Sequence, residues 1–263
     1  MSKQAARLRR VKVVTEDKPQ TKEKFLEVAR EVVGTQPLMP KFEAANTRQK
    51  QALAMLNEGR SVVFLSGSAG TGKSMIAAYR AATLLKQKKA DKIYLVRPAV
   101  SVGKSVGLVP GDLNEKLSHY FAQTVAHLEY FMGKGFTKYC LEHEVIELRA
   151  VEYLRGTSFE NCVCIFEEIQ NFTDEEFEMV LTRLGNGAQF ILTGDFRQHD
   201  LKGVSGLSTT IKMLQRMQDE QPDYLSDDDL QIMEDMIGIV EFQPEDVVRS
   251  GLTRAFVKMY HNN

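Results

Sequence analysis

The sequence predicts an α/β protein with three layers, an α/β/α sandwich built on a mainly parallel β-sheet. Short runs that are apolar throughout recur along the chain, and segments with helical spacing of apolar residues separate them. Strands of this kind belong to parallel sheets that helices cover on both faces. The length of 263 residues suits one large domain, or one domain with an appended arm.

The expected strands are short apolar runs that end at turn signals. In chain order, the first is the β-branched and aromatic run at 61–65, which a glycine-rich turn follows. The second, at 93–96, is stopped by Pro98. The remaining runs that are expected to form strands are 145–148, 162–166, 190–193 and 237–242.

The expected helices alternate with these strands. Residues 49–57 are closed by Gly59, and residues 75–88 are rich in Ala and end in lysines, which favour the helix dipole. In residues 113–131, apolar residues repeat at helical spacing. The positions of that repeat are Leu113, Leu117, Phe121, Thr124, Leu128 and Phe131. Further helices are expected at 22–33, 174–184 and 251–260.

Composition is that of an ordinary soluble protein. The net charge is −1, and 43% of the residues are apolar. No run approaches the roughly 18 apolar residues of a membrane span, and the basic N-terminus lacks the apolar stretch of a secretory signal. We therefore expect a cytoplasmic protein without a membrane partner.

Neither the cysteines nor the histidines predict a metal site. The three cysteines do not form a disulfide framework. Cys162 and Cys164 share one face of an expected strand, so we interpret them as buried residues rather than metal ligands. The five histidines lack the spacing of a metal site.

Two segments are strongly charged. Residues 1–12 carry five bases and no acid, and residues 219–235 carry eight acids and no base. We interpret the first as a flexible arm, with contact to RNA as the alternative. The second is interpreted as a solvated loop.

A phosphate-binding motif begins one residue after the first expected strand and opens a helix. Its glycines let backbone N–H groups turn towards phosphates, and the helix N-terminus adds partial positive charge. Lys73 can reach the β- and γ-phosphates, and the Ser74 hydroxyl can ligate Mg²⁺. The pattern predicts binding of ATP, or a related nucleoside triphosphate, with Mg²⁺. The motif, called the P-loop below, comprises Gly67, Ser68, Ala69, Gly70, Thr71, Gly72, Lys73 and Ser74.

Acidic residues follow a second strand. Glu167 and Glu168 end the apolar run at 162–166, where two acids in isolation would be equally typical of a solvated loop. Beside a P-loop, Glu167 is expected to hold the metal through a coordinated water, and Glu168 to act as general base. Gln198 follows the run at 190–193 and is a candidate to sense the γ-phosphate or to position water, because strand ends gather at one sheet edge.

The ordered motifs resemble the PhoH-like proteins, whose ATPase core is similar to one RecA-like lobe of a superfamily-one helicase. The resemblance covers residues 47–260 and identifies the chain as one P-loop ATPase domain over 41–263, with an arm and short helix at 1–40 and an acidic insertion near 219–235. The blocks that carry it are 67–74, 95–100, 107–117, 152–159, 164–171, 181–185, 192–201, 205–207 and 246–252.

The resemblance implies further site residues. Gln49 occupies the position of a glutamine that contacts adenine, and Arg97 lies in the RP motif and is assigned to nucleotide binding. Arg249 matches an arginine that acts on the γ-phosphate, although by itself it would be interpreted as a surface residue. One position departs from the family pattern: Glu167 stands where aspartate is usual, which shifts the metal geometry by about one carbon–carbon bond.

The resemblance also implies a biological role. Because the chain has room for one lobe, Arg249 must act either in cis or across a subunit interface, and a hexameric ring of identical subunits is implied. We expect an ATPase coupled to single-stranded RNA or DNA, of the helicase or remodelling type. The alternative is an ATP-dependent adaptor or switch acting on a protein partner, and nuclease activity is a distant third.

Overall fold

The computed structural model describes residues 39–98, 113–196, 205–220 and 222–261. Its six strands form one parallel sheet in the order β3-β2-β4-β5-β1-β6. This confirms the expected fold class, and every expected strand is present. The strands are β1 (Val62–Ser66), β2 (Lys92–Arg97), β3 (Ile146–Ala150), β4 (Cys162–Glu167), β5 (Gln189–Gly194) and β6 (Ile237–Glu241).

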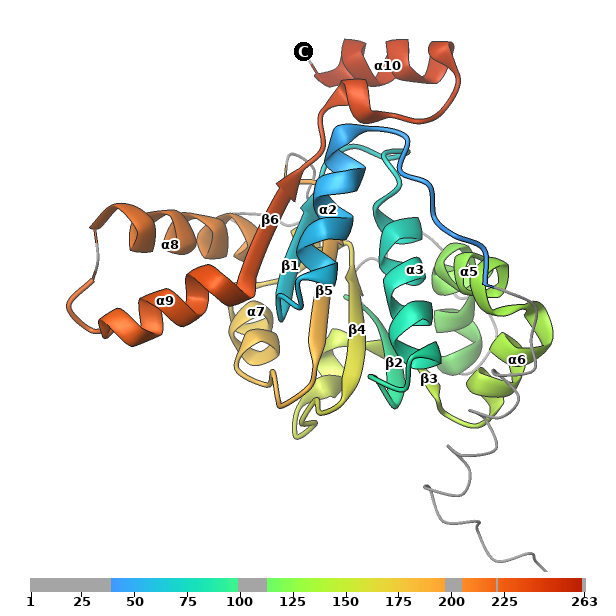
Figure 1. The fold of residues 1–263 in the computed structure, drawn as a ribbon, viewed down its shortest axis with the longest axis horizontal. Coiled ribbons are helices and arrows are strands. Elements are labelled where there is room, and N and C mark those ends of the chain that lie inside the picture. The colour runs from blue at the N-terminus through green and yellow to red at the C-terminus, as the bar shows by residue number, and fades with distance from the viewer. Residues whose placement is uncertain (1–38, 99–112, 197–204, 221, 262–263) are drawn as a thin grey trace, which may run out of the picture.

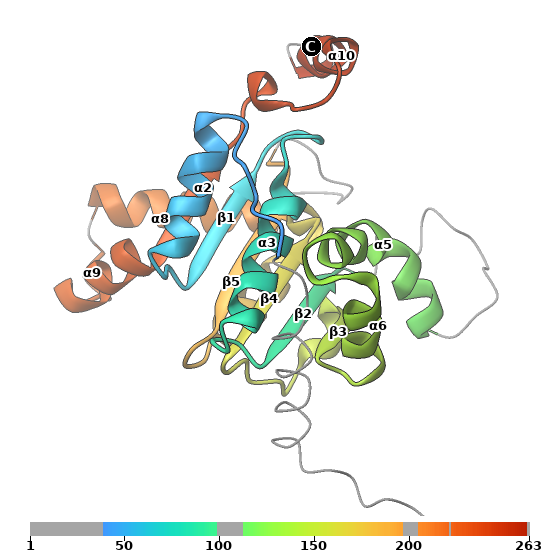
Figure 2. The same cartoon turned by 45° about the vertical axis from the view of Figure 1, so that its right-hand side comes forward.

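Helices cover both faces of the sheet, as Figures 1 and 2 show. On one face lie α2 (Thr47–Asn57), α3 (Lys73–Lys86), α5 (Leu113–Met132) and α6 (Lys134–Glu142). On the other lie α7 (Asp174–Leu181) and α8 (Gly206–Glu220). The remaining elements are α9 (Asp227–Met236), α10 (Gly251–His261) and the 3₁₀ turns η1 (Val151–Leu154), η2 (Ile169–Asn171) and η3 (Pro244–Asp246).

Strand β4 shows why the apolar runs are continuous. Val163 and Ile165 point into the core under α3, whereas Cys162, Cys164 and Phe166 point into the core under α7. The two cysteines share a face, as expected, with their sulfurs 3.8 Å apart. Because side chains alternate between faces, a strand buried on both sides has no solvent-facing position for a polar residue.

The register of the sheet gathers three strand ends at one edge. Strand β5 lies between β1 and β4, with Leu65 opposite Thr193 and Thr193 opposite Glu167. The P-loop follows β1, and Glu168 follows β4. Segments that are far apart in the sequence therefore meet at the carboxyl edge, as expected for a parallel sheet.

The interpretation of the acidic segment 219–235 as a loop is wrong for residues 219–220, which end α8, and for residues 227–235, which lie in α9. Ser226 and Asp229 form a reciprocal capping box, and three aspartates occupy the first turn. Carboxylates at a helix N-terminus satisfy free N–H groups and complement the dipole. Acidic clustering was thus a helix-start signal at this position.

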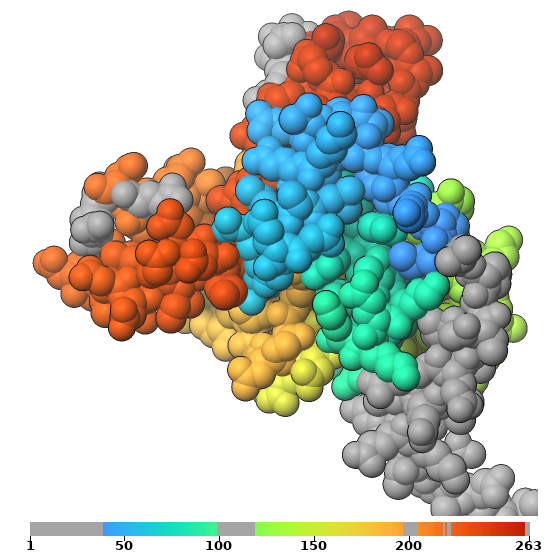
Figure 3. Space-filling view, in the orientation of Figure 1, coloured from blue at the N-terminus to red at the C-terminus, as the bar shows by residue number. Residues whose placement is uncertain are grey.

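Helices α8, α9 and α10 extend beyond the sheet. Figure 3 shows α8 and α9 projecting from one side and α10 standing beyond α2. Helices α6 and α8 were not anticipated from the sequence. The expected arm and helix at 1–40 lie outside the described residues, except for residues 39 and 40, and so does Gln198.

Candidate nucleotide-binding site

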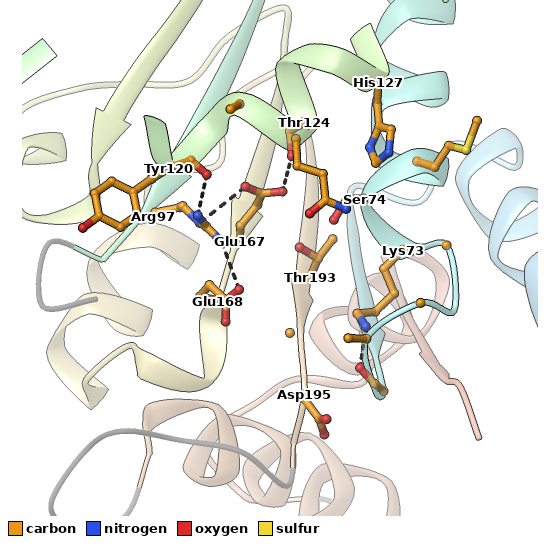
Figure 4. A pocket seen from close by; sticks show the side chains of 18 of the residues that line it. Lys73, Ser74, Arg97, Tyr120, Thr124, His127, Glu167, Glu168, Thr193 and Asp195 are labelled. Carbon is orange, nitrogen blue, oxygen red and sulfur yellow. Dashed lines mark hydrogen bonds and ion pairs between the residues drawn. The ribbon is translucent and has the colours of Figure 1, made fainter. Parts of the chain in front are cut away.

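A cavity of about 650 Å³ opens at the carboxyl edge of the sheet. The P-loop, the ends of β4 and β5, one face of α5 and the segment 248–249 line it. This volume is typical of small-molecule pockets. Figure 4 shows its main side chains.

The P-loop has the backbone that its glycines make possible. Gly67, Gly70 and Gly72 all have positive φ angles, of 140°, 89° and 92°. At Gly67 a Cβ atom would lie 2.5 Å from the carbonyl oxygen of Phe242, so no larger residue fits there. Helix α3 begins at Lys73, which places a helix N-terminus beside the cavity.

Lys73 is folded back onto its own loop. Its ammonium group donates to the carbonyl oxygens of Gly67 and Ser68, the latter at 2.9 Å. Burial lowers the pKa of Lys73 to about 8, although the charges of Asp195 and Glu168 favour the protonated form. The N–H groups of Lys73 that could donate to phosphate oxygens are therefore bonded to these carbonyl oxygens.

Glu167 is buried and held by several partners. It accepts a hydrogen bond from the Thr124 hydroxyl, and its Oε2 lies 3.4 Å from Arg97 Nε. Burial raises its pKa, and the charge of Arg97 and the hydroxyls of Thr124 and Ser74 oppose this effect. Serine hydroxyl and carboxylate oxygens are hard donors, and Mg²⁺ is usually held by one or two carboxylates together with substrate phosphates. Ser74 and Glu167 fit that ion.

Glu168 has a backbone conformation that is uncommon for a residue with a side chain. Its φ and ψ angles are 54° and 38°, in the left-handed region. Its carboxylate accepts hydrogen bonds from Arg97 Nη2 at 2.9 Å and from Gln170 Nε2 at 2.5 Å. The side-chain oxygen of Gln170 in turn accepts the backbone N–H of Asp195 at 3.2 Å. The end of β4 and the end of β5 are thus tied together.

A scan against protein-family models gives a match to the family described as PhoH-like protein, over residues 41–261. The chain belongs to this family. It is 36% identical over 237 residues to Protein PhoH of Escherichia coli strain K12, covering 89% of this chain and 61% of that protein. It is also 36% identical over 214 residues to a PhoH-like protein of Bacillus subtilis strain 168, covering 81% of this chain and 61% of that protein. The PhoH-like chain therefore spans about three-fifths of the length of these relatives.

Solved structures give more distant matches. One is a Sulfolobus solfataricus SWI2/SNF2 ATPase core in complex with dsDNA, with a TM-score of 0.39, 18% identity, and coverage of 60% of this chain and 33% of that chain. Another is the UvsW helicase from bacteriophage T4, with a TM-score of 0.41, 15% identity, and coverage of 64% and 59%. At such scores the likeness is partial, and we draw no functional inference from it.

Most residues predicted from the PhoH-like sequence come together in the cavity. Its lining includes Lys73, Ser74, Glu167, Glu168 and Arg249, together with Arg97 and the P-loop residues Gly67, Ala69, Gly70 and Gly72. Ser68 and Thr71 belong to the loop but do not line the cavity. Instead, the Thr71 hydroxyl donates to the Ser68 carbonyl at 3.1 Å and braces the loop internally.

Gln49 lies behind the P-loop rather than in the cavity. It is buried, its side-chain amide donates to the Thr71 carbonyl at 2.9 Å, and its side-chain oxygen accepts the N–H of Ala45 at 2.8 Å. A Cβ atom at Gly72 would lie 2.7 Å from its Nε2 atom. Contact between Gln49 and adenine stays a prediction, and it requires these bonds to be exchanged.

Arg249 lies against the P-loop of its own chain. A Cβ atom at Gly70 would lie 3.0 Å from both Cδ and Nε of Arg249. The preceding N–H, of Val248, donates to the Gly70 carbonyl at 3.0 Å. The segment after η3 is therefore attached to the loop at the cavity.

Helix α5 contributes lining residues that the sequence analysis missed, among them Gln123, Thr124 and His127. Thr124 had been counted only as a member of the helical repeat. A hydroxyl within an otherwise apolar row was the available signal, because a buried polar group requires a partner. Burial lowers the pKa of His127, and within the described part of the chain its Nδ1 atom has no hydrogen-bond partner.

Within the described ranges, none of the helices combines the length and hydropathy that crossing a bilayer would require.

Proposed function

We propose that this chain binds ATP with Mg²⁺ and hydrolyses the γ-phosphate bond, coupled to single-stranded RNA or DNA. In this proposal it is a helicase- or remodelling-type ATPase that works as a homo-oligomeric, hexameric ring. The observation that carries the hydrolytic part is that Lys73, Ser74, Glu167 and Glu168 line one cavity at the sheet edge. Phosphoryl transfer to water requires a loop that holds the phosphates, a cation, metal ligands and an accessible carboxylate.

Nucleotide binding would begin with an exchange at Lys73. Its ammonium group would leave the carbonyls of Gly67 and Ser68 and bond β- and γ-phosphate oxygens instead. Ser74 and Glu167 would hold Mg²⁺, Glu167 through a coordinated water, and the ion would neutralise charge on the β- and γ-oxygens. Ser74 and Glu167 both line the cavity, which supports this pairing.

Glu168 is the proposed general base. Its carboxylate is about 40% exposed at the cavity, whereas that of Glu167 is buried. An accessible carboxylate can accept a proton from water as the water attacks the γ-phosphorus, and a positioned base typically contributes about 10²–10⁴-fold. Gln198 remains a candidate to help position that water.

Arg249 is proposed to act on the nucleotide phosphates from within its own chain. Its contact with Gly70 supports action in cis, since the guanidinium already lies at the cavity. An arginine that stabilises transition-state charge is worth about 10³–10⁵-fold in rate. The hexameric ring rests on the family resemblance alone.

One observation favours the alternative, an ATP-dependent adaptor or switch. Helix α10 exposes a row of apolar side chains, with Leu252 69%, Phe256 50% and Tyr260 76% exposed. This helix follows Arg249 directly, so a protein bound to α10 would lie close to the segment attached to the P-loop. Exposed apolar patches are typical of surfaces that bind other proteins.

The test is phosphate release from Mg·ATP, with and without single-stranded RNA or DNA, over a protein dilution series. Lys73→Ala should lose activity, and Arg249→Ala should lose about 10³-fold or more. Matched controls are Lys86→Ala at the far end of α3 and Arg216→Ala on α8, both exposed, which should keep wild-type rates.

The outcomes separate the parts of the proposal. Stimulation by nucleic acid that weakens with salt supports coupling, whereas indifference to it favours the switch. A specific activity independent of dilution, with Arg249 essential, would support action in cis. Full activity of Lys73→Ala would refute hydrolysis at this site.

A further inference from the structure

Arg97 lines the cavity and contacts both carboxylates of the acidic pair, Glu167 and Glu168. It ends β2, next to β4 in the sheet. Its Nη2 donates to Glu168 at 2.9 Å, and its Nε lies 3.4 Å from Glu167 as an ion pair. Figure 4 shows the guanidinium between the two carboxylates.

The other side of the guanidinium is fixed by α5. Nη1 donates to the backbone carbonyl of Tyr120 at 2.5 Å, and the guanidinium carbon lies 5.9 Å from the ring centre of Phe121. All three nitrogens therefore face protein groups. Arginine presents its donors in a rigid planar fork, so these contacts fix the plane of the group.

The bond to Glu168 has a second support. Gln170 holds the other carboxylate oxygen of Glu168, so Arg97 and Gln170 grip the two oxygens separately. The left-handed backbone at Glu168 sets the direction of the side chain, and the two bonds set its rotation. A partly exposed glutamate without such bonds would sample many rotamers.

We propose that Arg97 is a positioning residue that orients Glu168 for proton transfer, and that it does not bind nucleotide phosphates. The inference rests on the proposed hydrolysis and departs from the nucleotide-binding role that the family resemblance implies. Glu167 and Glu168 hold the planar group on one side and the Tyr120 carbonyl holds it on the other, so turning it towards a nucleotide phosphate would strain these contacts and draw the cation away from buried Glu167. Holding a catalytic group in productive geometry is itself a large contribution to rate.

The test separates kcat from nucleotide affinity. In Arg97→Ala, kcat for Mg·ATP should fall about 100-fold or more, while the dissociation constant of a fluorescent ATP analogue stays close to wild type. Arg97→Lys should recover only part of kcat, because a point charge replaces a planar fork. Thermal unfolding of both variants shows whether they remain folded, and Arg97→Lys keeps a cation beside Glu167 if Arg97→Ala does not fold.

A double variant distinguishes positioning from a merely structural role. If Arg97 acts through Glu168, then Arg97→Ala in a Glu168→Gln background should cause no further loss of kcat. The matched control is Arg149→Ala on the neighbouring strand β3, which removes a comparable arginine–glutamate pair, with Glu147, outside the cavity lining. It should leave kcat unchanged.

Three results would overturn the inference. They are full kcat in Arg97→Ala, a roughly tenfold or larger loss of nucleotide affinity at unchanged kcat, and additive losses in the double variant. In each of these cases the wild type still hydrolyses ATP and the proposed function stands. A wild type that hydrolyses no ATP would instead refute the proposed function, and the role of Arg97 with it.

Discussion

At the scale of single residues, Gln49 shows how position alters the role of a side chain. Its amide is buried and both of its ends are bonded, to Thr71 and Ala45. Truncation would leave the buried carbonyl of Thr71 without this partner, whereas the N–H of Ala45, an exposed residue, can bond water instead. Each unsatisfied group of this kind costs about 1–3 kcal/mol.

We expect Gln49→Ala to lower the stability of the protein and to weaken the binding of ATP and the binding of GTP to the same extent. The physical reason is that the side chain braces the loop that is proposed to hold phosphates, and the two nucleotides share these phosphates. Denaturant unfolding and binding of fluorescent ATP and GTP analogues check this expectation. A loss confined to ATP would show that Gln49 reads adenine.

The contiguous parts of the site could be predicted because short-range pattern is sufficient there. The residues 67–74 and the pair Glu167–Glu168 each follow an apolar strand, and parallel strands bring their ends together. Thr124 and Gln170 could not be predicted in the same way. Thr124 meets Glu167 across 43 residues of sequence, through the packing of α5, and no local pattern encodes that distance.

At the scale of elements, α7 has a complete start signal. The Thr173 hydroxyl accepts the N–H of Glu176, and the Glu176 carboxylate accepts the N–H of Thr173. The expected start of the helix at residue 174 is confirmed, and this capping box is the physical reason that the helix begins there. Its end falls at Leu181 rather than at the expected residue 184.

Thr173→Ala should reduce the free energy of unfolding by about 1 kcal/mol, because one N–H of the first turn loses its acceptor. Thr173→Ser keeps the hydroxyl and should retain most of the stability. Urea denaturation of the three proteins gives the comparison. Equal midpoints for Ala and Ser would show that the cap contributes nothing.

The acidic helix α9 differs from α7, because its sequence was interpreted as a loop. Its first turn has the same kind of box, from Ser226 and Asp229, yet the run of acids led to the expectation of a loop. Charge density indicated exposure correctly, because α9 has no buried residue. Exposure alone does not decide between helix and loop, and the cap does.

At the scale of the whole molecule, the strand order predicts a link between ligand and stability. The residues proposed to bind metal and phosphate lie in the loop after β1, at the start of α3 and at the end of β4, so a bound Mg·ATP would join three elements of the fold. Binding to the folded state alone stabilises it by about 2.7 kcal/mol at a ligand concentration 100 times the dissociation constant.

Mg·ATP should therefore raise the melting temperature of the wild type, and removing Mg²⁺ with a chelator should reduce that shift. Ser74→Ala should keep a shift with ATP alone but lose the additional effect of Mg²⁺, since its hydroxyl is a proposed ligand. Differential scanning fluorimetry gives these values. An Mg²⁺ effect of wild-type size in Ser74→Ala would exclude the hydroxyl as a ligand.

The inward fold of Lys73 also bears on turnover. Because the ammonium group is bonded to the carbonyl oxygens of its own loop, its charge has partners within the chain itself. If the proposed hydrolysis takes place in this cavity, release of ADP would return the ammonium group to these carbonyl oxygens. Release would then not have to wait for an incoming ATP.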